Sequence, residues 1–477
     1  MAQNGNKTQN LQSASVPHVL VIPFPSQGHL LPLLDLVYHL SMRHLSLTIA
    51  VTPANLPLLS PLLAKSPPNS VETIVLPFPS HPSIPHGVEN AKDLPLLAHF
   101  HAFMHTLVGL MDPLLSWARS HPKPVSAIIS DSFLGWTQNL AAELDIPRIV
   151  FSSNGLLFTA ISHYLWLRMP RRPDQNDDNY PVSFEEVANS PVYPWRHLSW
   201  LYRTYVEGDP DSEFIKENFL LNLKSEFVVT NSFEALEGEE FRQSVQTLGF
   251  KQVWSVGPLA PTTGASDRGG IASMSAGEVM TWLDGCPDGL VLYICFGTQM
   301  ELSTEQGAAV AAALELSGVR FIWVNKGASA VPDGFEKRTA DRGRVIGGWA
   351  PQLAILNHAA VGWFLTHCGW NSVLEAITAG VAMLTWPMAA DQFCNARLLI
   401  ESAKVAVPAV EGMKTVPDAE ELGRILTNTV GEGGKEIRER AKELSTKAVE
   451  AVREGGSSWR ELEDLVEEIY KISSKVN

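Results

Sequence analysis

A histidine and an aspartate occupy equivalent places in two separate strand-to-helix connections of the sequence. His29 follows the apolar run of residues 18–24, and Asp131 directly follows the apolar run of residues 125–130. Because open α/β sheets bind ligands at the carboxyl ends of their strands, both side chains are expected at the same edge of one sheet. An imidazole titrates near neutral pH and can take a proton from a hydroxyl, and a carboxylate can orient that imidazole. The two residues therefore predict general-base chemistry on a phenol or an alcohol.

Each of these two residues also has a purely structural explanation. His29 is equally consistent with a histidine at a helix start that makes a single hydrogen bond. Asp131 is also suited to cap the helical pattern that follows it, since aspartate is a favoured N-cap residue. Residue type and position alone leave both explanations open.

A second group of chemically capable side chains lies within residues 349–392. The apolar run of residues 361–365 stops before the sequence HCGWNS (residues 367–372), and a helical pattern begins at Val373. At such a junction, free backbone N–H groups and the positive end of the helix dipole favour a phosphate group. Aromatic rings, a carboxylate and a terminal Asp-Gln pair surround the junction, namely Trp349, Trp370, Trp386, Glu375, Asp391 and Gln392. This combination predicts a pocket for a nucleotide sugar.

Residues 349–392 resemble, along their whole length, the signature box of the plant secondary-product glycosyltransferases, the UDP-sugar-dependent enzymes of family 1. The resemblance implies an inverting enzyme with two facing Rossmann-like domains, the GT-B fold, which uses a UDP-sugar as co-substrate and needs no cofactor or metal ion. Two departures from the family pattern are visible. Ala382 replaces a usual proline, which is expected to loosen a turn slightly, and Thr298 replaces a usual serine but keeps the hydroxyl.

The resemblance also implies roles for individual residues of the nucleotide-sugar pocket. Trp349, Ala350 and Gln352 would contact uracil and ribose, although core packing is the favoured reading of Trp349 taken alone. Glu375 would accept hydrogen bonds from the ribose hydroxyls. The expected diphosphate contacts are His367, Asn371, Ser372 and Thr298, and the expected sugar contacts are Trp370, Asp391 and Gln392.

In the first half of the chain, the resemblance assigns His29 as the catalytic base and Asp131 as its partner. Glucose is the expected sugar because a terminal glutamine such as Gln392 is typical of glucose users in the family, with rhamnose and xylose as alternatives. The expected acceptor is a flavonoid or another plant phenolic, since apolar walls with few polar groups suit flat aromatic ligands. The candidate acceptor contacts are Gly28, Phe133, Trp136, Phe151, Trp195 and Trp200.

The elements that position these residues follow from an alternation of apolar runs with helical patterns. In the first half, strands are predicted at residues 18–24, 47–52, 71–78, 125–130, 148–152 and 227–231. In the second half, they are predicted at residues 291–296, 320–324, 345–348, 361–366, 383–386 and 405–410. Helical patterns between them, including residues 30–42, 94–119, 136–144 and 156–167, imply βαβ units and mostly parallel sheets.

The length of 477 residues favours two domains. We expect an acceptor-binding domain at residues 1–257, a linker rich in proline, glycine and serine at residues 258–275, and a UDP-sugar-binding domain at residues 276–455. The resemblance implies that a last helix, in residues 456–477, crosses back to the first domain. Residues 168–210 have no clear period and are predicted to form a long irregular excursion over the pocket rim.

Composition narrows the class of protein. The net charge of -15 argues against nucleic acid or an anionic membrane as the main partner. No apolar run approaches membrane-spanning length, and the polar first residues do not read as a signal peptide. The four cysteines (Cys286, Cys295, Cys368 and Cys394) lack CxxC spacing and are expected to be reduced. A cytoplasmic, monomeric enzyme fits these features.

Other functions were weighed against this interpretation. His101 and His105, with His99 nearby, have a spacing that can bind a metal ion, but no carboxylate or cysteine completes a convincing site, so a helix face that is exposed or lines the pocket is preferred. A nicotinamide-dependent oxidoreductase is disfavoured because no GxGxxG sequence follows a predicted strand. A glycosidase would need a carboxylate pair across the scissile bond, and none is identified. A non-catalytic nucleotide-sugar sensor with the same fold stays open, although the His29–Asp131 pair argues against it.

Overall fold

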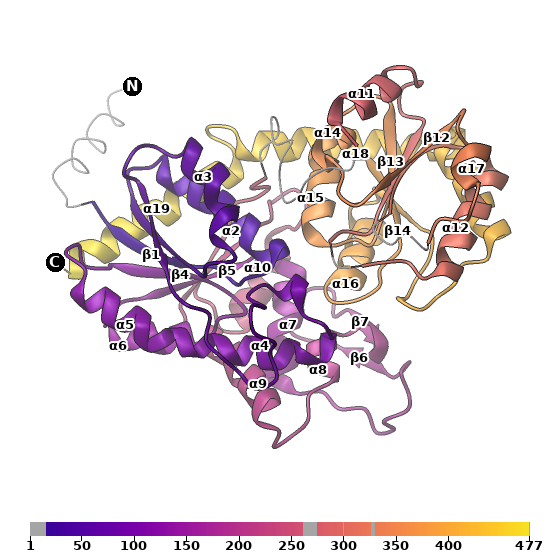
Figure 1. The fold of residues 1–477 in the computed structure, drawn as a ribbon. Helices are drawn as coiled ribbons and strands as arrows, with labels where there is room; N and C mark the ends of the chain where they lie inside the picture. The colour runs from indigo at the N-terminus through magenta and orange to yellow at the C-terminus, as the bar shows by residue number, and fades with distance from the viewer. Residues whose placement is uncertain (1–15, 261–273, 299, 326–329, 477) are drawn as a thin grey trace.

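The chain folds into two lobes, each built around a parallel β-sheet that helices cover (Figure 1). The computed structural model describes residues 16–260, 274–298, 300–325 and 330–476. The arrangement confirms the predicted α/β class with two Rossmann-like domains. Most of the predicted linker, residues 261–273, lies outside the described residues, and the domain boundaries at residues 257, 275 and 455 stay predictions.

The first lobe contains a seven-stranded sheet with the order β3-β2-β1-β4-β5-β8-β9. Its strands are β1 (His18–Ile22), β2 (Ser46–Val51), β3 (Val71–Val75), β4 (Ala127–Asp131), β5 (Arg148–Ser152), β8 (Phe227–Thr230) and β9 (Gln252–Ser255). Strands β1, β4 and β5 are buried along their whole length, as expected for parallel strands covered on both faces. The strand order reverses between β1 and β4, so the carboxyl ends of these two strands border a crevice where ligands bind in such sheets.

Helices of the first lobe connect these strands and pack on the sheet. They are α2 (Gln27–Ser41), α3 (Ser60–Lys65), α4 (Phe100–Thr106), α5 (Met111–Ser120), α6 (Thr137–Glu143), α7 (Leu156–Arg168), α8 (Trp200–Arg203), α9 (Pro210–Asn222) and α10 (Glu239–Thr247). Helix α9 begins where the Asp209 side chain accepts a hydrogen bond from the Ser212 N–H, and Pro210 fits the first helical position, where no donor is needed.

The second lobe contains a six-stranded sheet with the order β12-β11-β10-β13-β14-β15. Its strands are β10 (Val291–Cys295), β11 (Arg320–Asn325), β12 (Gly343–Gly347), β13 (Val361–Thr366), β14 (Ala382–Thr385) and β15 (Ala406–Pro408). Its helices are α11 (Ala276–Asp284), α12 (Thr304–Ser317), α13 (Phe335–Arg338), α14 (Gln352–Leu356), α15 (Trp370–Ala379), α16 (Gln392–Arg397), α17 (Ala419–Val430) and α18 (Lys435–Val452). Gly380 ends α15 in the left-handed conformation, and Ala382 then pairs with Trp363 as the first residue of β14.

The C-terminal helix α19 (Ser457–Val476) packs against the first lobe, although α18 packs on α15 of the second lobe (Figure 1). Leu465 and Ile469 are buried in the hydrophobic cluster that also holds Val21 and Ile129 of the first sheet. Glu463 forms an ion pair of 2.7 Å with Arg43 on the same lobe. The end of the chain therefore ties the two lobes together.

Three segments differ from the sequence-based expectations. Strand β9 was missed because it is a four-residue edge strand with little apolar patterning. Residues 94–119 do not form one helix, because Pro113 removes a backbone donor and falls in the first turn of a new helix, α5. The excursion at residues 168–210 is not wholly irregular, since it contains an antiparallel hairpin of β6 (Pro181–Ser183) and β7 (Val192–Pro194), followed by α8.

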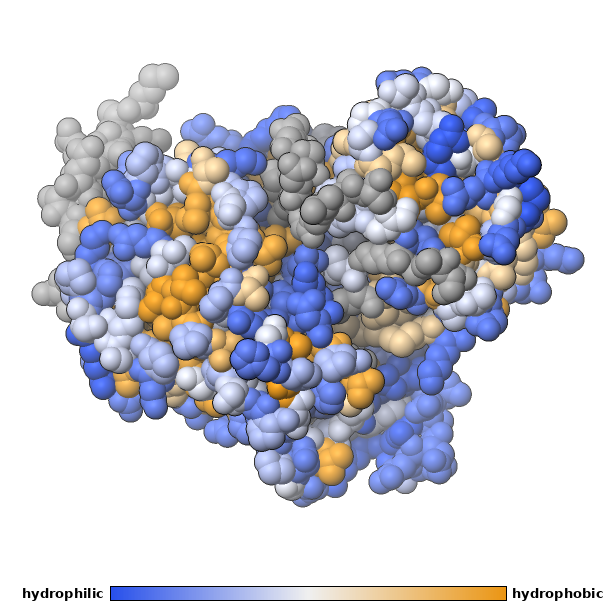
Figure 2. Space-filling view, in the orientation of Figure 1, coloured by the Kyte–Doolittle hydropathy of each residue, from blue (hydrophilic) through white to orange (hydrophobic). Residues whose placement is uncertain are grey.

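The outside of the molecule is polar over much of its area. In Figure 2, blue hydrophilic residues are spread over both lobes on the visible face, and apolar residues form smaller areas between them. Within the described parts of the chain, every helix is too short or too polar to cross a bilayer.

Candidate active site between the two lobes

A cavity of about 400 Å³ lies between the lobes, at the carboxyl ends of strands from both sheets. Its first-lobe wall includes Gly28 and His29 at the start of α2, and its second-lobe wall includes Trp349 before α14 and Trp370 at the start of α15. The crevice predicted from the strand order is therefore the place where residues from both halves of the sequence come together.

His29 and Asp131 form a hydrogen-bonded pair on the first-lobe side of the cavity. The Nδ1 atom of His29 lies 3.0 Å from Oδ2 and 3.1 Å from Oδ1 of Asp131. The Asp131 side chain is 0% exposed, whereas that of His29 is 16% exposed. Ser153 contacts the same nitrogen at 3.4 Å, and within the described residues no hydrogen bond engages Nε2. The second ring nitrogen is therefore available to a ligand.

The environment of His29 favours its protonated form. Burial lowers the pKa of His29, but the charge and hydrogen bond of Asp131 and the charge of Asp391 together raise that pKa above its usual value. Phe133 packs against the imidazole with ring centroids 4.4 Å apart. The backbone N–H of Phe133 also donates to Asp131 Oδ1 at 2.8 Å. Asp131 therefore caps its own turn rather than helix α6, which begins six residues later, and still orients His29.

On the second-lobe side, the predicted nucleotide contacts form a network of their own. The amide nitrogen of Gln352 donates to Glu375 at 2.6 Å and to the Ser372 hydroxyl at 3.2 Å. Tyr293 donates to the other end of the Gln352 amide at 3.2 Å. The Trp349 side chain is half-buried and lines the cavity, and so does Ala350. These groups line one cavity together, as expected from the sequence.

The strand-to-helix junction before α15 is tightly packed around His367. A Cβ atom on Gly369 or on Gly297 would come within 2.5 Å or 2.7 Å of the His367 ring, so both positions need glycine. Cys368 adopts a left-handed φ of 65°, a strained conformation for a residue with a side chain. This turn places the backbone N–H groups at the start of α15 against the cavity, beside Thr298, which also lines it.

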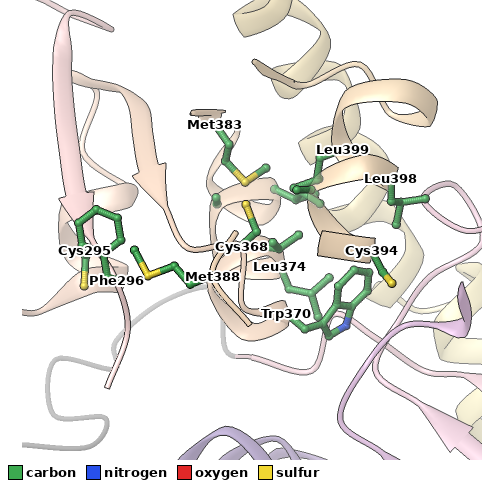
Figure 3. Packing of buried hydrophobic residues seen from close by; sticks show 14 of the residues in the cluster. Cys295, Phe296, Cys368, Trp370, Leu374, Met383, Met388, Cys394, Leu398 and Leu399 are labelled. Atoms are coloured by element: carbon green, nitrogen blue, oxygen red, sulfur yellow. The ribbon is translucent and has the colours of Figure 1, made fainter. Parts of the chain in front are cut away.

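Trp370 and Asn371 contact the first lobe directly. The indole N–H of Trp370 donates to the Asn231 carbonyl at 2.7 Å, and the Asn371 amide donates to the Gly28 carbonyl at 3.0 Å. Figure 3 shows the Trp370 ring beside Leu374, among the buried residues of the second lobe. Both residues border the cavity, but their hydrogen bonds hold the two lobes together.

Asp391 and Gln392 lie at the start of α16 and line the cavity. The side-chain carbonyl of Gln392 accepts hydrogen bonds from the backbone N–H groups of Met388 and Ala389, both at 2.9 Å. Any contact of Gln392 with a sugar therefore comes from its amide nitrogen. Asp391 accepts a hydrogen bond of 2.6 Å from Asn395. Burial raises the pKa of Asp391, and this bond and the nearby His29 act in the opposite direction.

Three of the predicted acceptor contacts line the cavity, and three do not. Gly28, Phe133 and Trp200 border it. The prediction was wrong for the others: Trp136 lies in the first-lobe core, Trp195 packs under the Arg172 guanidinium, and Phe151 faces the cluster beneath α19, because alternate strand residues point to opposite faces. The lining residues that the sequence analysis did not predict include Phe100, Ser153, Asn154, Phe158, Ser162, Leu201 and Phe219.

Two of these residues had a usable signal in the sequence. Ser153 and Asn154 directly follow strand β5, at the sheet edge that already identified His29 and Asp131. Phe100, Phe158 and Phe219 lie on three different helices, and their approach depends on how those helices pack. No motif or spacing in the sequence reveals such packing.

The histidines of α4 have partners other than a metal ion. His105 lies 2.7 Å from Asp211 and stacks on Phe214, and His101 stacks on Trp200 with ring centroids 5.0 Å apart. Among the described residues, no group of three histidine, cysteine, aspartate or glutamate side chains is placed to hold a metal ion. All four cysteines are free. These histidines support the wall of the cavity that Trp200 forms.

A second set of interlobe contacts joins the excursion at residues 168–210 to helix α16. Glu411 accepts from Arg196 at 2.9 Å and lies 2.8 Å from His197. The His197 ring stacks on Phe393 with centroids 4.2 Å apart. Arg397 donates to the Val192 carbonyl at 2.7 Å. The helix that begins with Gln392 is therefore held by the segment that also carries Trp200.

Comparisons with known proteins identify the family of the chain. The family described as UDP-glucoronosyl and UDP-glucosyl transferase matches residues 250–422. A flavonol 3-O-glucosyltransferase of Arabidopsis thaliana is 48% identical over 465 residues, which cover 95% of this chain and 96% of the relative. UDP-glycosyltransferase 89B2 of Stevia rebaudiana is 49% identical over 462 residues, covering 95% and 97%.

Solved structures show the same relationship. The crystal structure of Arabidopsis thaliana UGT89C1 complexed with UDP-L-rhamnose is 38% identical, covers 96% of this chain and 100% of that chain, and has a TM-score of 0.78. The same protein has been solved in complex with quercetin, with a TM-score of 0.77 and 37% identity. Given identities of this size over nearly the whole length, the chain belongs to the UDP-glycosyltransferase family and is a UDP-dependent glycosyltransferase.

Proposed function

We propose that this enzyme transfers glucose from UDP-glucose to a hydroxyl of a flavonoid or a similar plant phenolic, with inversion at the anomeric carbon. One observation supports the proposal: the His29 ring, hydrogen-bonded to Asp131 through Nδ1, borders the same cavity as the predicted nucleotide-sugar residues of the other lobe. A base in the first lobe and a UDP-sugar in the second lobe suit attack on the anomeric carbon from the face opposite the leaving UDP.

The reaction begins with removal of a proton. The acceptor hydroxyl gives its proton to Nε2 of His29, and the buried carboxylate of Asp131 stabilises the imidazolium that forms. The hydroxyl oxygen bonds to the anomeric carbon as the bond from that carbon to the UDP oxygen breaks. UDP leaves with the negative charge, and the product is a β-glycoside when the donor is an α-linked UDP-glucose.

The diphosphate is stabilised by the junction before α15. Backbone N–H groups at the helix start, with His367, Ser372 and Thr298 beside them, present donors where charge develops on the leaving group. Because these groups supply the positive potential, we expect EDTA to leave the initial rate unchanged. An assay with and without EDTA checks this, and loss of activity that a divalent cation restores would contradict it.

Glucose is proposed as the sugar on the chemistry of Gln392 and Asp391. The Gln392 carbonyl is fixed by two backbone N–H groups, so its amide nitrogen donates to a sugar hydroxyl, while the Asp391 carboxyl accepts from one. A site built to bond particular hydroxyls discriminates strongly against a sugar that lacks them. Xylose lacks the 6-hydroxymethyl group, and rhamnose carries a methyl group and has a different configuration.

The acceptor is proposed to be flat and aromatic because five apolar rings line the first-lobe wall. These are the rings of Phe100, Phe133, Phe158, Trp200 and Phe219. Polar groups of the same wall, among them Ser153, Asn154 and Ser162, can bond phenolic hydroxyls. The flavonol named in one relative and the quercetin bound in one similar structure support the same class of acceptor.

A competition experiment tests both halves of this proposal. UDP-glucose, UDP-rhamnose and UDP-xylose are supplied together with one flavonol, and the products are identified by mass. We expect the hexoside to dominate, and we expect Gln392→Ala to lower kcat/KM more for UDP-glucose than for UDP-xylose. A dominant rhamnoside or pentoside would contradict the choice of glucose, and no glycosylated phenolic at all would contradict the acceptor class.

We further propose that the enzyme acts as a monomer in the cytosol, where its four free cysteines stay reduced. Light scattering of the purified protein and imaging of a fluorescent fusion test the two statements separately. A stable dimer would contradict the first, and a signal confined to a secretory compartment would contradict the second.

A further inference from the structure

The turn that carries Asp131 is held by buried side chains from two other elements. Four consecutive carbonyls, those of residues 131–134, each accept a side-chain hydrogen bond. The Arg148 guanidinium donates to the carbonyls of Asp131 at 3.2 Å and Leu134 at 3.3 Å. Asn222 donates to the Ser132 carbonyl, and Asn218 donates to the Phe133 carbonyl, both at 2.8 Å.

These three side chains are almost completely removed from solvent. Arg148 is 1% exposed, Asn218 is 1% exposed and Asn222 is 0% exposed. Two of them are bonded to each other, since Arg148 donates to the Asn222 side-chain oxygen at 2.8 Å, and Arg148 also donates to the Ser130 hydroxyl at 2.7 Å. A buried network in which each member has partners fixes local geometry, because any displacement leaves a polar group unpaired.

Arg148 differs from the two asparagines because it brings a charge. All of its hydrogen-bond acceptors are neutral: a hydroxyl, a side-chain amide and two backbone carbonyls. Burial lowers the pKa of the guanidinium to about 9, and the charge of Asp131 acts in the opposite direction. Arg148 is therefore still a cation at neutral pH. A neutral donor would satisfy the same carbonyls without the unfavourable desolvation of a charge.

The catalytic cycle explains why a cation is useful at this place. Asp131 is fully buried, and a buried carboxylate is unfavourable without a compensating charge. In the state that is ready to react, His29 is neutral, and it provides that charge only after it has taken the acceptor proton. While His29 is neutral and waiting for the acceptor, Arg148 is the cation beside Asp131, bonded to that residue's own carbonyl.

We propose that Arg148 is a positioning residue for proton transfer: it holds the turn of residues 131–134 and offsets the charge of Asp131 while His29 is neutral, with Asn218 and Asn222 completing the geometry. The inference rests on the proposed roles of His29 and Asp131. It places no new group in contact with the substrate, because Arg148 acts through Asp131.

Arg148→Met tests the proposal, because it keeps much of the side-chain volume and removes both the charge and the fork of donors. With a phenol acceptor, we expect kcat to fall by about 10²-fold, the lower end of what a positioned base contributes. With a nitrophenol that is already ionised at the assay pH, the loss should be less than about 10-fold, because no base is then needed. The affinity for UDP, measured by calorimetry, should be unchanged.

Two companion variants separate charge from geometry. Arg148→Lys keeps the charge but cannot reach all four acceptors, and we expect an intermediate loss of about 10-fold with the phenol. Arg242→Met is the matched control, since Arg242 is a partly buried arginine that pairs with Glu461, and neither residue lines the cavity. It should lose stability only and keep the wild-type ratio of rates for the two acceptors.

A signal that needs no substrate distinguishes failure of this inference from failure of the proposed function. The hydrogen-bonded Nδ1 proton of His29, identified by its loss in His29→Ala, should move or broaden in the proton NMR spectrum of Arg148→Met and stay unchanged in Arg242→Met. If Arg148→Met does not fold, Arg148→Lys carries the same comparison. An unchanged Nδ1 signal, or equal losses of kcat with both acceptors, would overturn the proposal even if the wild-type enzyme glycosylates phenols. An altered Nδ1 signal would support the proposal even if the wild-type enzyme does not glycosylate phenols.

Discussion

The polar residues of the two lobes are bonded in different ways. In the first lobe, His29 and Asp131 already make the hydrogen bond that proton transfer needs. In the second lobe, Gln352, Glu375 and the Ser372 hydroxyl are bonded to one another. If the proposed roles hold, a bound nucleotide exchanges some of these second-lobe bonds for its own, whereas an acceptor only has to reach a His29 nitrogen that is already in place.

Because of this difference, we expect substitutions in the two lobes to change different quantities, the turnover rate in one case and the affinity for the sugar donor in the other. Preorganised groups act without rearrangement at the moment of reaction, so changes in the first lobe should lower kcat. Groups that exchange partners on binding contribute to donor affinity, so changes in the second lobe should raise the donor KM.

Asp131→Asn should have the largest of these effects, a loss of about 10²–10⁴-fold in kcat for a phenol acceptor. The charge and hydrogen bond of Asp131 raise the pKa of His29, so their removal should lower it. His29 must be neutral to accept a proton, so the wild-type rate should fall as the pH drops through that raised pKa. In the variant, this fall should move to lower pH. A pH profile of kcat checks both points, and an acid limb that stays in place would contradict the coupling.

Trp349→Ala should weaken binding of UDP with little change in kcat. The uracil would lose an aromatic face, and stacking of a base on such a face is worth roughly 1–3 kcal/mol. Trp349→Phe keeps an aromatic ring and is the control. Calorimetry with UDP measures the effect. If a folded Trp349→Ala bound UDP as the wild type does, Trp349 would be a packing residue.

The sequence could identify residues whose role follows from their place at a strand end. His29 and Asp131 are close because β1 and β4 are neighbours, and their predicted proximity is confirmed. The grouping of Trp349, Glu375 and Gln392 around one cavity follows equally from the motif that contains them. Their roles in catalysis and binding stay predictions.

Other residues depend on packing between elements, which local patterns do not encode. Trp136 and Trp195 are apolar and aromatic, a character that suits both the wall of a ligand pocket and the hydrophobic core. The packing of the first lobe places both in the core. From the sequence alone, Arg148 is only the first residue of a predicted strand, and nothing in the pattern indicates a buried role. Its importance appears only when α9 brings Asn222 beside it.

Glu411→Gln should have the smallest effect. Hydrogen bonds from His197 and Arg196 lower the pKa of Glu411 to about 2, so its contribution to stability is present above its usual value of 4.5 and is lost as the pH falls towards 2. The side chain is 48% exposed, so the loss should be less than about 1 kcal/mol. Thermal unfolding at pH 7 should show a small decrease in Tm that disappears at low pH. A large loss of kcat would instead assign this contact to catalysis.

The separation of catalysis from donor binding is tested most directly by His29→Ala. The kcat for a phenol acceptor and the Kd for UDP are measured on the same preparation, alongside the wild type. The account predicts a loss of about 10²–10⁴-fold in kcat with an unchanged Kd, because the base lies in the lobe opposite the nucleotide. A variant that turns over at the wild-type rate, or one that loses affinity for UDP in parallel with kcat, would contradict it.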